Sequence, residues 1–266
     1  MKKDLNLFGR IFLIIILVLF QLSPNIKADN KSPVVTKHLG RVLPLNLKFT
    51  NSNGSQVLLR DLINKPTVID FVYYTCPGIC TPLMMEVSDV IGKVKYEPGT
   101  DYDIICLSID HNETTQMAAD KKHAMFQLCS KEIPDSAWTF LTGDSTSIYK
   151  LTNSAGFGFV KNNIGGFQHQ GVLIFVDEHG KIVQYLSPSY VKETAEFKIL
   201  PSEFEMAVEK ATKGEITSTL TKVLQTCSRY IPKGRSGIIL LIIFGSGIIT
   251  LSVVFVIIKR TKKRFS

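Results

Sequence analysis

Residues 67–74, TVIDFVYY, form a run of β-branched and aromatic side chains without the polar alternation of a half-exposed strand. Such a run is typical of a central strand that is covered on both faces. Cys76 and Cys80 follow directly, and after them LMMEVSDVIGKV shows helical spacing. Thr81 and Pro82 match the N-cap and first position of this helix. The sequence therefore predicts a buried sheet in which a short cysteine loop joins the central strand to a helix.

The alternation of strand and helix patterns continues to residue 225. An N-terminal hairpin is predicted at residues 45–59, because apolar and polar residues alternate around Asn53-Gly54. The later elements are a strand at 101–110, a helix at 114–129, a strand at 138–144, a helix at 145–156 ended by Gly156, a hairpin at 171–186 turning at Glu178-His179-Gly180, and a helix at 201–225. This order predicts an α/β fold with a central sheet and flanking helices.

The first 28 residues have the pattern of a secretory signal peptide. Lys2, Lys3 and Arg10 precede the apolar run IFLIIILVLF, and Ala28 supplies a small residue at the expected cleavage position. The apolar run is short compared with the roughly 20 residues that a membrane-spanning helix needs. An uncleaved N-terminal anchor is the alternative interpretation.

The other end of the chain predicts a transmembrane helix at residues 237–258, which carry no charge. Five basic residues follow within 259–266, so the positive-inside rule places this tail in the cytoplasm. Between the ends we expect a polar leader at 29–44, one domain at 45–226 and a juxtamembrane linker at 227–236. The domain is then tethered on the outer or periplasmic side of the cell membrane.

The formal net charge of +8 arises at the two ends of the chain. Residues 29–258 carry 22 basic and 22 acidic side chains, so no nucleic-acid partner is expected. The five cysteines are too few for a disulfide scaffold, and their odd number leaves at least one unpaired.

Cys76, Cys80 and His169 are the candidate functional residues. The cysteines fall at the carboxyl end of a central strand, where open α/β sheets bind their ligands. The positive end of the following helix favours thiolate over thiol. His169 lies 89 residues after Cys80 and just before a strand. Thiolates bind soft ions and exchange disulfides, and an imidazole completes a three-coordinate site, so the sequence predicts a soft-metal or redox site.

Simpler interpretations exist for the same three residues. Cys76 and Cys80 could form a structural disulfide, although so short a loop would stabilise the fold little. His169, taken alone, is typical of a hydrogen-bonded loop residue. Asp110 and His111 end a neighbouring strand at the same sheet edge, where they could contact and orient the ligands.

The other sulfur-containing residues receive no functional role. Cys106 within a strand, Cys129 at the end of a helix, and Met84 and Met85 at helical spacing are predicted core residues. Cys227 lies between the domain and the membrane helix and is left unassigned.

FVYYTCPGIC, LSID, a single histidine before a strand, and GKIVQYL together resemble the Sco/SenC family of copper proteins, over about residues 40–226. The motif is specific, because three residues separate the cysteines instead of the two found in thioredoxins. The resemblance implies a thioredoxin-like fold with Cys76, Cys80 and His169 as copper ligands. The chain departs from many members at Gln168, where they have aspartate, and at Gly78, where they have an acidic or polar residue.

The resemblance also implies a function: a copper metallochaperone, not an enzyme, that assists assembly of the copper centre of cytochrome c oxidase. Its partner would be the oxidase subunit that bears this centre. Two thiolates and an imidazole suit Cu(I) and also accept Cu(II). Zinc is the main competitor, but the motif holds no carboxylate or base to use a zinc-activated water. Copper requires the reduced pair, so an upstream thiol reductant is expected.

A second hypothesis comes from another class of protein. A membrane-tethered thiol–disulfide oxidoreductase would cycle Cys76 and Cys80 between dithiol and disulfide on exported proteins, with His169 tuning their pKa. The longer loop, the distant histidine and the lack of a Trp-Cys-x-x-Cys sequence count against it. A peroxidase of the same fold ranks third, because it would need Thr or Ser where Tyr73 stands.

Overall fold

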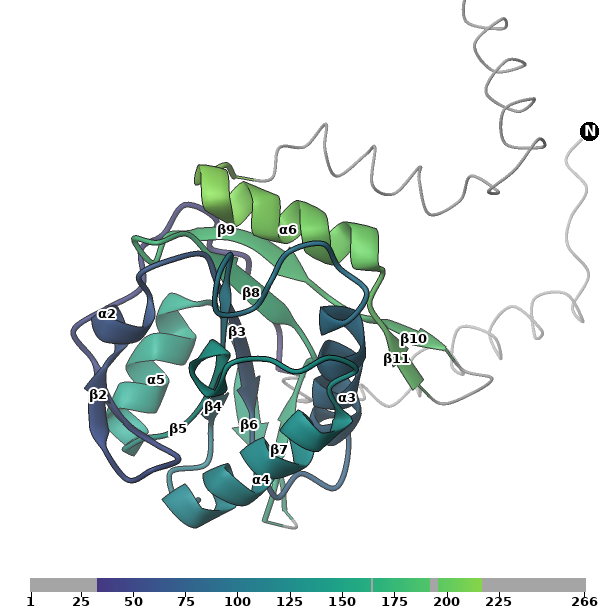
Figure 1. Cartoon of the computed structure of the whole chain (residues 1–266). Coiled ribbons are helices and arrows are strands. Elements are labelled where there is room, and N and C mark those ends of the chain that lie inside the picture. The colour runs from purple at the N-terminus through teal and green to yellow at the C-terminus, as the bar shows by residue number, and fades with distance from the viewer. Residues whose placement is uncertain (1–32, 164, 192–195, 217–266) are drawn as a thin grey trace, which may run out of the picture. The chain divides into compact units, whose positions relative to one another are not determined.

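A seven-stranded sheet forms the centre of the domain (Figure 1). The structure is a computed structural model, and it describes residues 33–163, 165–191 and 196–216. The strand order is β2-β1-β5-β4-β3-β8-β9, in which β3, β4 and β5 are parallel while β1 and β8 pair antiparallel with β5 and β3. The strands are β1 (Lys48–Asn51), β2 (Gln56–Leu58), β3 (Thr67–Val72), β4 (Asp103–Ser108), β5 (Trp138–Thr142), β8 (Leu173–Val176) and β9 (Ile182–Leu186).

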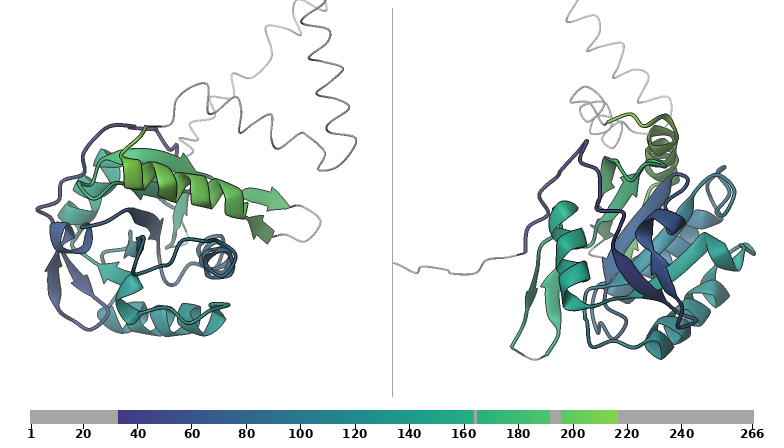
Figure 2. Two further views of the ribbon diagram at one scale, coloured as in Figure 1. Left: turned by 45° about the horizontal axis from the view of Figure 1, so that its top comes forward. Right: turned by 90° about the vertical axis from the view of Figure 1, so that its left-hand side faces the viewer.

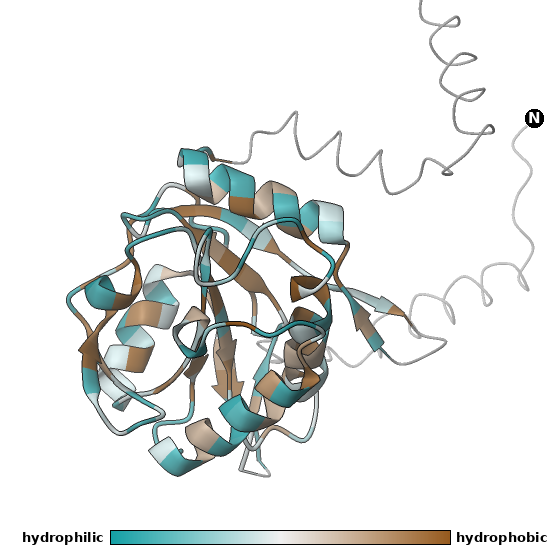
Figure 3. Ribbon diagram, viewed as in Figure 1, coloured by the Kyte–Doolittle hydropathy of each residue, from teal (hydrophilic) through white to brown (hydrophobic). Residues whose placement is uncertain are grey.

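The predicted central strand is β3, and all of its residues are buried. Its side chains alternate between two covered faces: Asp70 lies opposite Cys106 of β4, and Phe71 lies opposite Leu107. The strands at the centre of the sheet are largely hydrophobic, whereas the helices carry hydrophilic residues on their outer surfaces (Figure 3). This distribution is the one expected of a sheet that is buried on both sides.

Helices cover both faces of the sheet (Figure 2). On one side α3 and α4 contact each other, and Phe126 of α4 packs against Trp138 of β5. On the other side lies α5, and Phe157, which follows this helix, packs against Phe71. The helices are α2 (Leu59–Leu62), α3 (Cys80–Ile91), α4 (Thr115–Leu128), α5 (Ser145–Ser154) and α6 (Pro201–Lys213), with a 3₁₀ turn at Asp135–Ala137.

The predicted order of hairpin, βαβαβα, hairpin and helix is confirmed. The last helix is shorter than predicted: α6 ends at Lys213 and does not continue to 225. Gly214 adopts a left-handed conformation with φ 60° and caps the helix. Of the predicted remainder, residues 217–225 lie outside the described part of the chain.

The start of α3 also differs from the prediction. The helix begins at Cys80 and not at Pro82, and its N-cap is Ile79, which makes no side-chain capping bond, in place of Thr81. Pro82 is therefore the third helical residue. Its missing N–H costs nothing there, because the amides of the first turn have no acceptor within the helix.

Two short hairpins lie outside the central sheet, and the sequence pattern does not predict either of them. β6 (Phe159–Lys161) pairs with β7 (Phe167–His169), and β10 (Ser189–Val191) pairs with β11 (Glu196–Lys198). Three residues are too few to show a recognisable periodicity. The β6–β7 hairpin is important here because its last residue is His169.

Residues 33–44, expected to form part of a polar leader, lie along the domain. The Thr36 N–H donates to the Gly156 carbonyl at 2.8 Å, the Gly40 N–H donates to the Ile182 carbonyl at 2.8 Å, and Leu43 is buried. The segment is the dark purple trace beside α5 in the right-hand view of Figure 2. Its contacts are mainly backbone hydrogen bonds, which side-chain periodicity does not report.

Several predictions fall outside the described residues. They concern the signal peptide at 1–28, the linker at 227–236 with Cys227, the transmembrane helix at 237–258 and the basic tail at 259–266. Within the residues that the structure does describe, no helix is both long and apolar enough to cross a bilayer.

Candidate metal centre

The loop between β3 and α3 carries both cysteines. The Cys76 N–H donates to the Tyr73 carbonyl at 3.1 Å, which turns the chain immediately after the strand. The Gly78 N–H donates to the Cys76 sulfur at 3.3 Å. Cys80 then opens α3 and is buried, whereas Cys76 is half-buried. Both are free thiols, and the sulfur nearer to solvent is that of Cys76.

A buried carboxylate braces the start of this loop. Glu113 accepts hydrogen bonds from the N–H groups of Tyr74 and Thr75 at 2.7 Å each, from the Thr75 hydroxyl at 2.7 Å and from the Ser108 hydroxyl at 2.6 Å. Bonds to a charged acceptor are among the stronger ones in proteins. Glu113 therefore ties the residues before Cys76 to the end of β4. The sequence analysis missed this residue, since nothing in the local pattern distinguishes it from an exposed glutamate.

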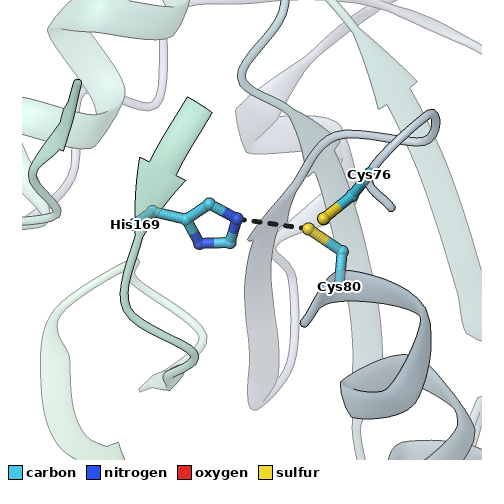
Figure 4. Close-up of side chains that lie close together, drawn as sticks. All are labelled: Cys76, Cys80 and His169. Carbon is cyan, nitrogen blue, oxygen red and sulfur yellow. Dashed lines mark hydrogen bonds between the residues drawn. The ribbon is translucent and has the colours of Figure 1, made fainter. Parts of the chain in front are cut away.

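His169 reaches the cysteines from β7. Its Nε2 atom lies 3.2 Å from the Cys80 sulfur (Figure 4). Its Nδ1 atom lies 3.2 Å from the Gln170 carbonyl oxygen. An Nδ1–H that donates to this carbonyl leaves the Nε2 lone pair directed at the sulfurs. The candidate ligand atoms of Cys76, Cys80 and His169 all lie within 4.8 Å of one another. The structure thus brings together the three residues that the sequence singled out.

The two thiols have opposite pKa shifts. The neighbouring Cys80 thiol holds the pKa of Cys76 well below its usual value; burial opposes this shift, and the nearby His169 side chain and the backbone N–H groups of Cys80 and Gly78 support it. The interaction with Cys76, together with burial, raises the pKa of Cys80. The two shifts favour a thiolate on Cys76 and a retained proton on Cys80. A thiolate is the form that binds metal and attacks disulfides.

Asp70 lies within the central strand, near the site. Its side chain is fully buried, and neither carboxyl oxygen has a hydrogen-bond partner among the described residues. Burial raises the pKa of Asp70 to about 7, and the charge of His169 acts in the opposite direction. The sequence did carry a signal for this residue, because Asp70 is the single charged side chain in TVIDFVYY.

Aromatic rings surround the imidazole. The ring centroids of Phe157 and Tyr73 lie 5.6 Å and 6.0 Å from that of His169, and Phe167 contacts Tyr73 at 5.6 Å. The Tyr73 hydroxyl interacts with the Cys76 side chain and donates to the Phe167 carbonyl oxygen at 3.5 Å. Burial, with a contribution from Cys76, raises the pKa of Tyr73 to about 12, so the hydroxyl keeps its proton as a donor.

Asp110 and His111, considered in the sequence as residues that could orient the ligands, make other contacts in the structure. The Asp110 carboxylate accepts bonds from the backbone and side chain of Asn112 at 3.0 and 2.9 Å. His111 lines a surface hollow together with Lys48 and Glu113. Among the described residues, the cluster of metal-ligating side chains consists of the two cysteines and His169 alone. The positions of Asp110 and His111 therefore give no support for a role in orienting the ligands.

The sulfur-containing residues predicted for the core divide into two groups. Met84 is buried as predicted, and so is Cys106, whose sulfur accepts a bond from the Trp138 ring N–H at 3.1 Å. Cys129 is half-buried at the end of α4 and packs against the core, whereas Met85 is 46% exposed, so the core prediction is wrong for Met85. Helical spacing predicted that both Met84 and Met85 lie on the buried face of α3, but only Met84 does.

The donor set fits a soft metal ion. Two sulfurs and one imidazole nitrogen converge, the lowered pKa of Cys76 favours its thiolate, and the nitrogen presents a lone pair. Cu(I) prefers such low-coordinate sulfur and nitrogen sites, and hard cations such as Mg²⁺ prefer oxygen ligands. Cys76 is the half-buried ligand, so an exchanging ligand could approach the metal beside it.

A family model and similar proteins identify the fold. The model of the SCO1/SenC family matches residues 44–200. The SCO1 protein homolog of Bacillus subtilis (strain 168) is 30% identical over 149 residues, which are 53% of this chain and 74% of that protein.

Two solved structures are similar at lower identity. One is a protein of Aquifex aeolicus VF5 assigned to electron transfer, with a TM-score of 0.57, 21% identity, and coverage of 66% of this chain and 95% of its own. The other is ScoI of Arabidopsis thaliana, solved with copper bound, with a TM-score of 0.50, 18% identity, and coverage of 62% and 96%. These likenesses support the thioredoxin-like α/β fold. The family model covers more than half of the chain and the Bacillus relative is matched over most of its length, so this chain belongs to the SCO1/SenC family.

Proposed function

We propose that this chain is a membrane-tethered copper metallochaperone that assists assembly of the copper centre of cytochrome c oxidase. The observation that carries the proposal is the convergence of the Cys76, Cys80 and His169 ligand atoms within 4.8 Å in a member of this family. The copper-bound structure of the Arabidopsis relative is consistent with copper as the cargo.

Each ligand has a distinct part in loading and release. The lowered pKa of Cys76 favours its thiolate, so Cu(I) needs to displace only the proton on Cys80 to gain its second sulfur ligand. His169 would bind the copper ion through the lone pair of Nε2, because its Nδ1 faces the Gln170 carbonyl. Release by ligand exchange would begin at Cys76, the less buried sulfur, where an acceptor thiolate can reach the metal.

The tether belongs to the same proposal. The uncharged segment 237–258 would anchor the domain on the outer or periplasmic face of the membrane, with the basic residues 259–266 in the cytoplasm. A tethered donor meets a membrane-bound acceptor at a raised effective concentration. Protease added to the outer face of intact spheroplasts should digest the domain and spare a tag placed after Ser266; digestion of the tag would refute this orientation.

Copper titration of the purified full-length chain tests the function. We expect the reduced protein to bind about one copper ion per chain and the Cys76→Ser, Cys80→Ser double variant to bind none stoichiometrically. His169→Ala should weaken chiefly Cu(II), because two thiolates still hold Cu(I). His123→Ala, an exposed histidine on α4, is the matched control and should behave as the parent. Stoichiometric copper in the double variant would refute the assigned ligands.

A thiol–disulfide oxidoreductase is the second candidate, and the lowered pKa of Cys76 beside the Cys80 thiol favours it specifically. In this activity the Cys76 thiolate attacks a disulfide of an exported protein and expels the other sulfur of that disulfide as a thiolate. The full-length Cys80→Ser variant should therefore trap a mixed disulfide with such a protein, and Cys76→Ser should trap none. If the parent turned over such disulfides but bound no copper, the oxidoreductase would replace the chaperone as the function.

A further inference from the structure

His169 is held by a part of the chain that lies outside the central sheet. It ends β7, which pairs with β6 in a separate two-stranded sheet, and it lies opposite Phe159 there. Cys76 and Cys80 are instead fixed by β3 and α3. The distance from the imidazole to the sulfurs therefore depends on how the β6–β7 hairpin is fastened to the domain.

Residues 34–38, which we term the N-terminal strap, contact the stretch that leads into β6. Val35 forms an antiparallel bridge with Phe157, and the Thr36 N–H donates to the Gly156 carbonyl at 2.8 Å. Two residues after Phe157, Phe159 pairs with His169. A backbone connection thus runs from the strap, through 156–159, to the nitrogen ligand.

Two glycines allow this close approach. A Cβ atom at Gly158 would lie 2.7 Å from the Val34 carbonyl oxygen and 3.2 Å from the Val34 nitrogen. A Cβ atom at Gly156 would overlap the Thr36 carbonyl oxygen. These neighbours are backbone atoms, which cannot move aside as the end of a side chain can. Larger residues at either position would displace the strap.

Phe157 joins the strap to the imidazole through its side chain as well. Its ring is 2% exposed, and its centroid lies 4.9 Å from that of Phe71 in β3 and 5.6 Å from that of His169. The imidazole therefore rests against a ring whose backbone the strap holds. A shift of Phe157 would move both this wall and the strand that pairs with His169.

Apolar burial does not account for the strap. Val34 is 61% exposed and Val35 is half-buried, so the start of the strap adds little to the core. Its fixed points are polar: besides the Thr36 bond, the His38 N–H donates to the Tyr185 hydroxyl at 3.0 Å, and this hydroxyl donates to the Ala155 carbonyl at 2.8 Å. These hydrogen bonds link the strap to residues 155–156, just before β6.

We infer that the N-terminal strap positions the His169 imidazole against the Cys76–Cys80 pair, acting through Phe157 and Phe159. The inference rests on the proposed copper site and assigns part of its geometry to residues outside the ligand set. Two thiolates alone hold Cu(I), whereas Cu(II) gains more from the nitrogen ligand. Displacement of the strap should therefore weaken Cu(II) binding and spare Cu(I).

Two substitutions test the contact from opposite sides. Gly158→Ala places a methyl group against the Val34 backbone, and Thr36→Pro removes the N–H that donates to Gly156. In the purified full-length chain, each should weaken Cu(II) binding by about tenfold or more, as loss of groups that orient a metal ligand commonly does. The thiolate-to-Cu(II) absorption should fade, and Cu(I) affinity should match the parent.

A second measurement needs no metal. In the reduced, metal-free protein, the rings of Phe157 and Tyr73 should displace the NMR signals of the His169 imidazole protons from their usual positions, because both rings lie close to the imidazole. In both strap variants these signals should move toward those of an exposed histidine. A merely structural role would lower the melting temperature without this movement.

Gly180→Ala is the matched control. It also adds a methyl group at a crowded glycine, with φ 73° and the Leu45 side chain 2.7 Å away. It lies in the β8–β9 turn. Because β8 runs antiparallel to β3, this turn is at the end of the sheet where β3 begins, away from Cys76. This variant should be less stable than the parent but keep both copper affinities and the His169 signals.

Parent-like Cu(II) binding and parent-like His169 signals in both strap variants would overturn the inference. Equal losses of Cu(I) and Cu(II), or a selective Cu(II) loss in Gly180→Ala, would also overturn it, since either indicates general destabilisation. Failure of the proposed function looks different: the parent would bind no copper, or His169→Ala would bind Cu(II) as the parent does. The NMR measurement would still decide the positioning role in that case.

Discussion

Replacement of Asp70 by asparagine should change how the stability of the domain depends on pH. Asp70 is fully buried, and burial raises its folded-state pKa from 3.8 to about 7. The unfolded chain loses this proton near pH 4, whereas the folded protein keeps it until about pH 7. Between these values the folded state binds more protons, so its stability should fall as the pH rises.

The expected size follows from the shift. One pKa unit corresponds to about 1.4 kcal/mol, so a shift of about three units removes about 4 kcal/mol of unfolding free energy between pH 4 and pH 7. The contribution is fully present below pH 4 and is lost as the pH passes through 7. The asparagine side chain of the variant would have nearly the same shape and no titration. Burial of the asparagine amide has a cost that does not depend on pH, so it shifts the unfolding free energy of the variant equally at every pH.

Urea unfolding of the reduced, metal-free domain, residues 29–226, at pH 4 to 8 measures this effect. Trp138 is the single tryptophan and is fully buried, so its fluorescence reports unfolding. The parent should lose stability relative to Asp70→Asn by about 1.4 kcal/mol per pH unit between pH 4 and pH 7, and the difference should level off above pH 7. Asp61→Asn, at an exposed carboxylate, controls for the loss of one charge. Parallel pH profiles for the parent and Asp70→Asn would refute the reasoning.

Three further outcomes are expected. Cys76 should react with iodoacetamide at pH 6 nearly as fast as at pH 8, because its lowered pKa keeps it a thiolate at both pH values. A reaction rate roughly 100-fold lower at pH 6 than at pH 8, as for an ordinary thiol, would contradict this. Tyr73→Phe removes the hydroxyl that interacts with Cys76 and should weaken copper binding by about two- to tenfold in titrations, the worth of one polar contact. Tyr149→Phe, at an exposed ring, should leave copper binding unchanged. Glu113→Ala leaves loop amides unpaired and should lower the free energy of unfolding in urea by about 3 kcal/mol. Glu132→Ala, at an exposed glutamate, should change this free energy by no more than about 0.5 kcal/mol. Equal effects of the two substitutions would show that Glu113 does not brace the loop.

The short elements show where prediction from the sequence stopped. The run 67–74 is long enough for its composition to indicate a buried strand, and β3 is that strand. β7 has three residues and β10 has three, so neither carries a pattern. The start of α3 was misplaced because Pro82 fits any position of a first turn, and only backbone geometry distinguishes these positions.

The sequence by itself determined the chemical type of the site. Cys76, Cys80 and His169 could be chosen because few residue types supply soft ligands, and because the cysteines follow a recognisable buried strand. The α/β order of the domain was determined in the same way, since hydrophobic periodicity is a local property of the chain.

Only the tertiary structure decided how the site is held. The pKa of Asp70 depends on burial, the bracing of the loop depends on Glu113 meeting amides 38 and 39 residues away, and the place of His169 depends on a hairpin and on the N-terminal strap. Each of these is a contact between segments far apart in the chain. No local pattern encodes such a contact, because its energy arises only when folding brings the segments together and excludes water from between them.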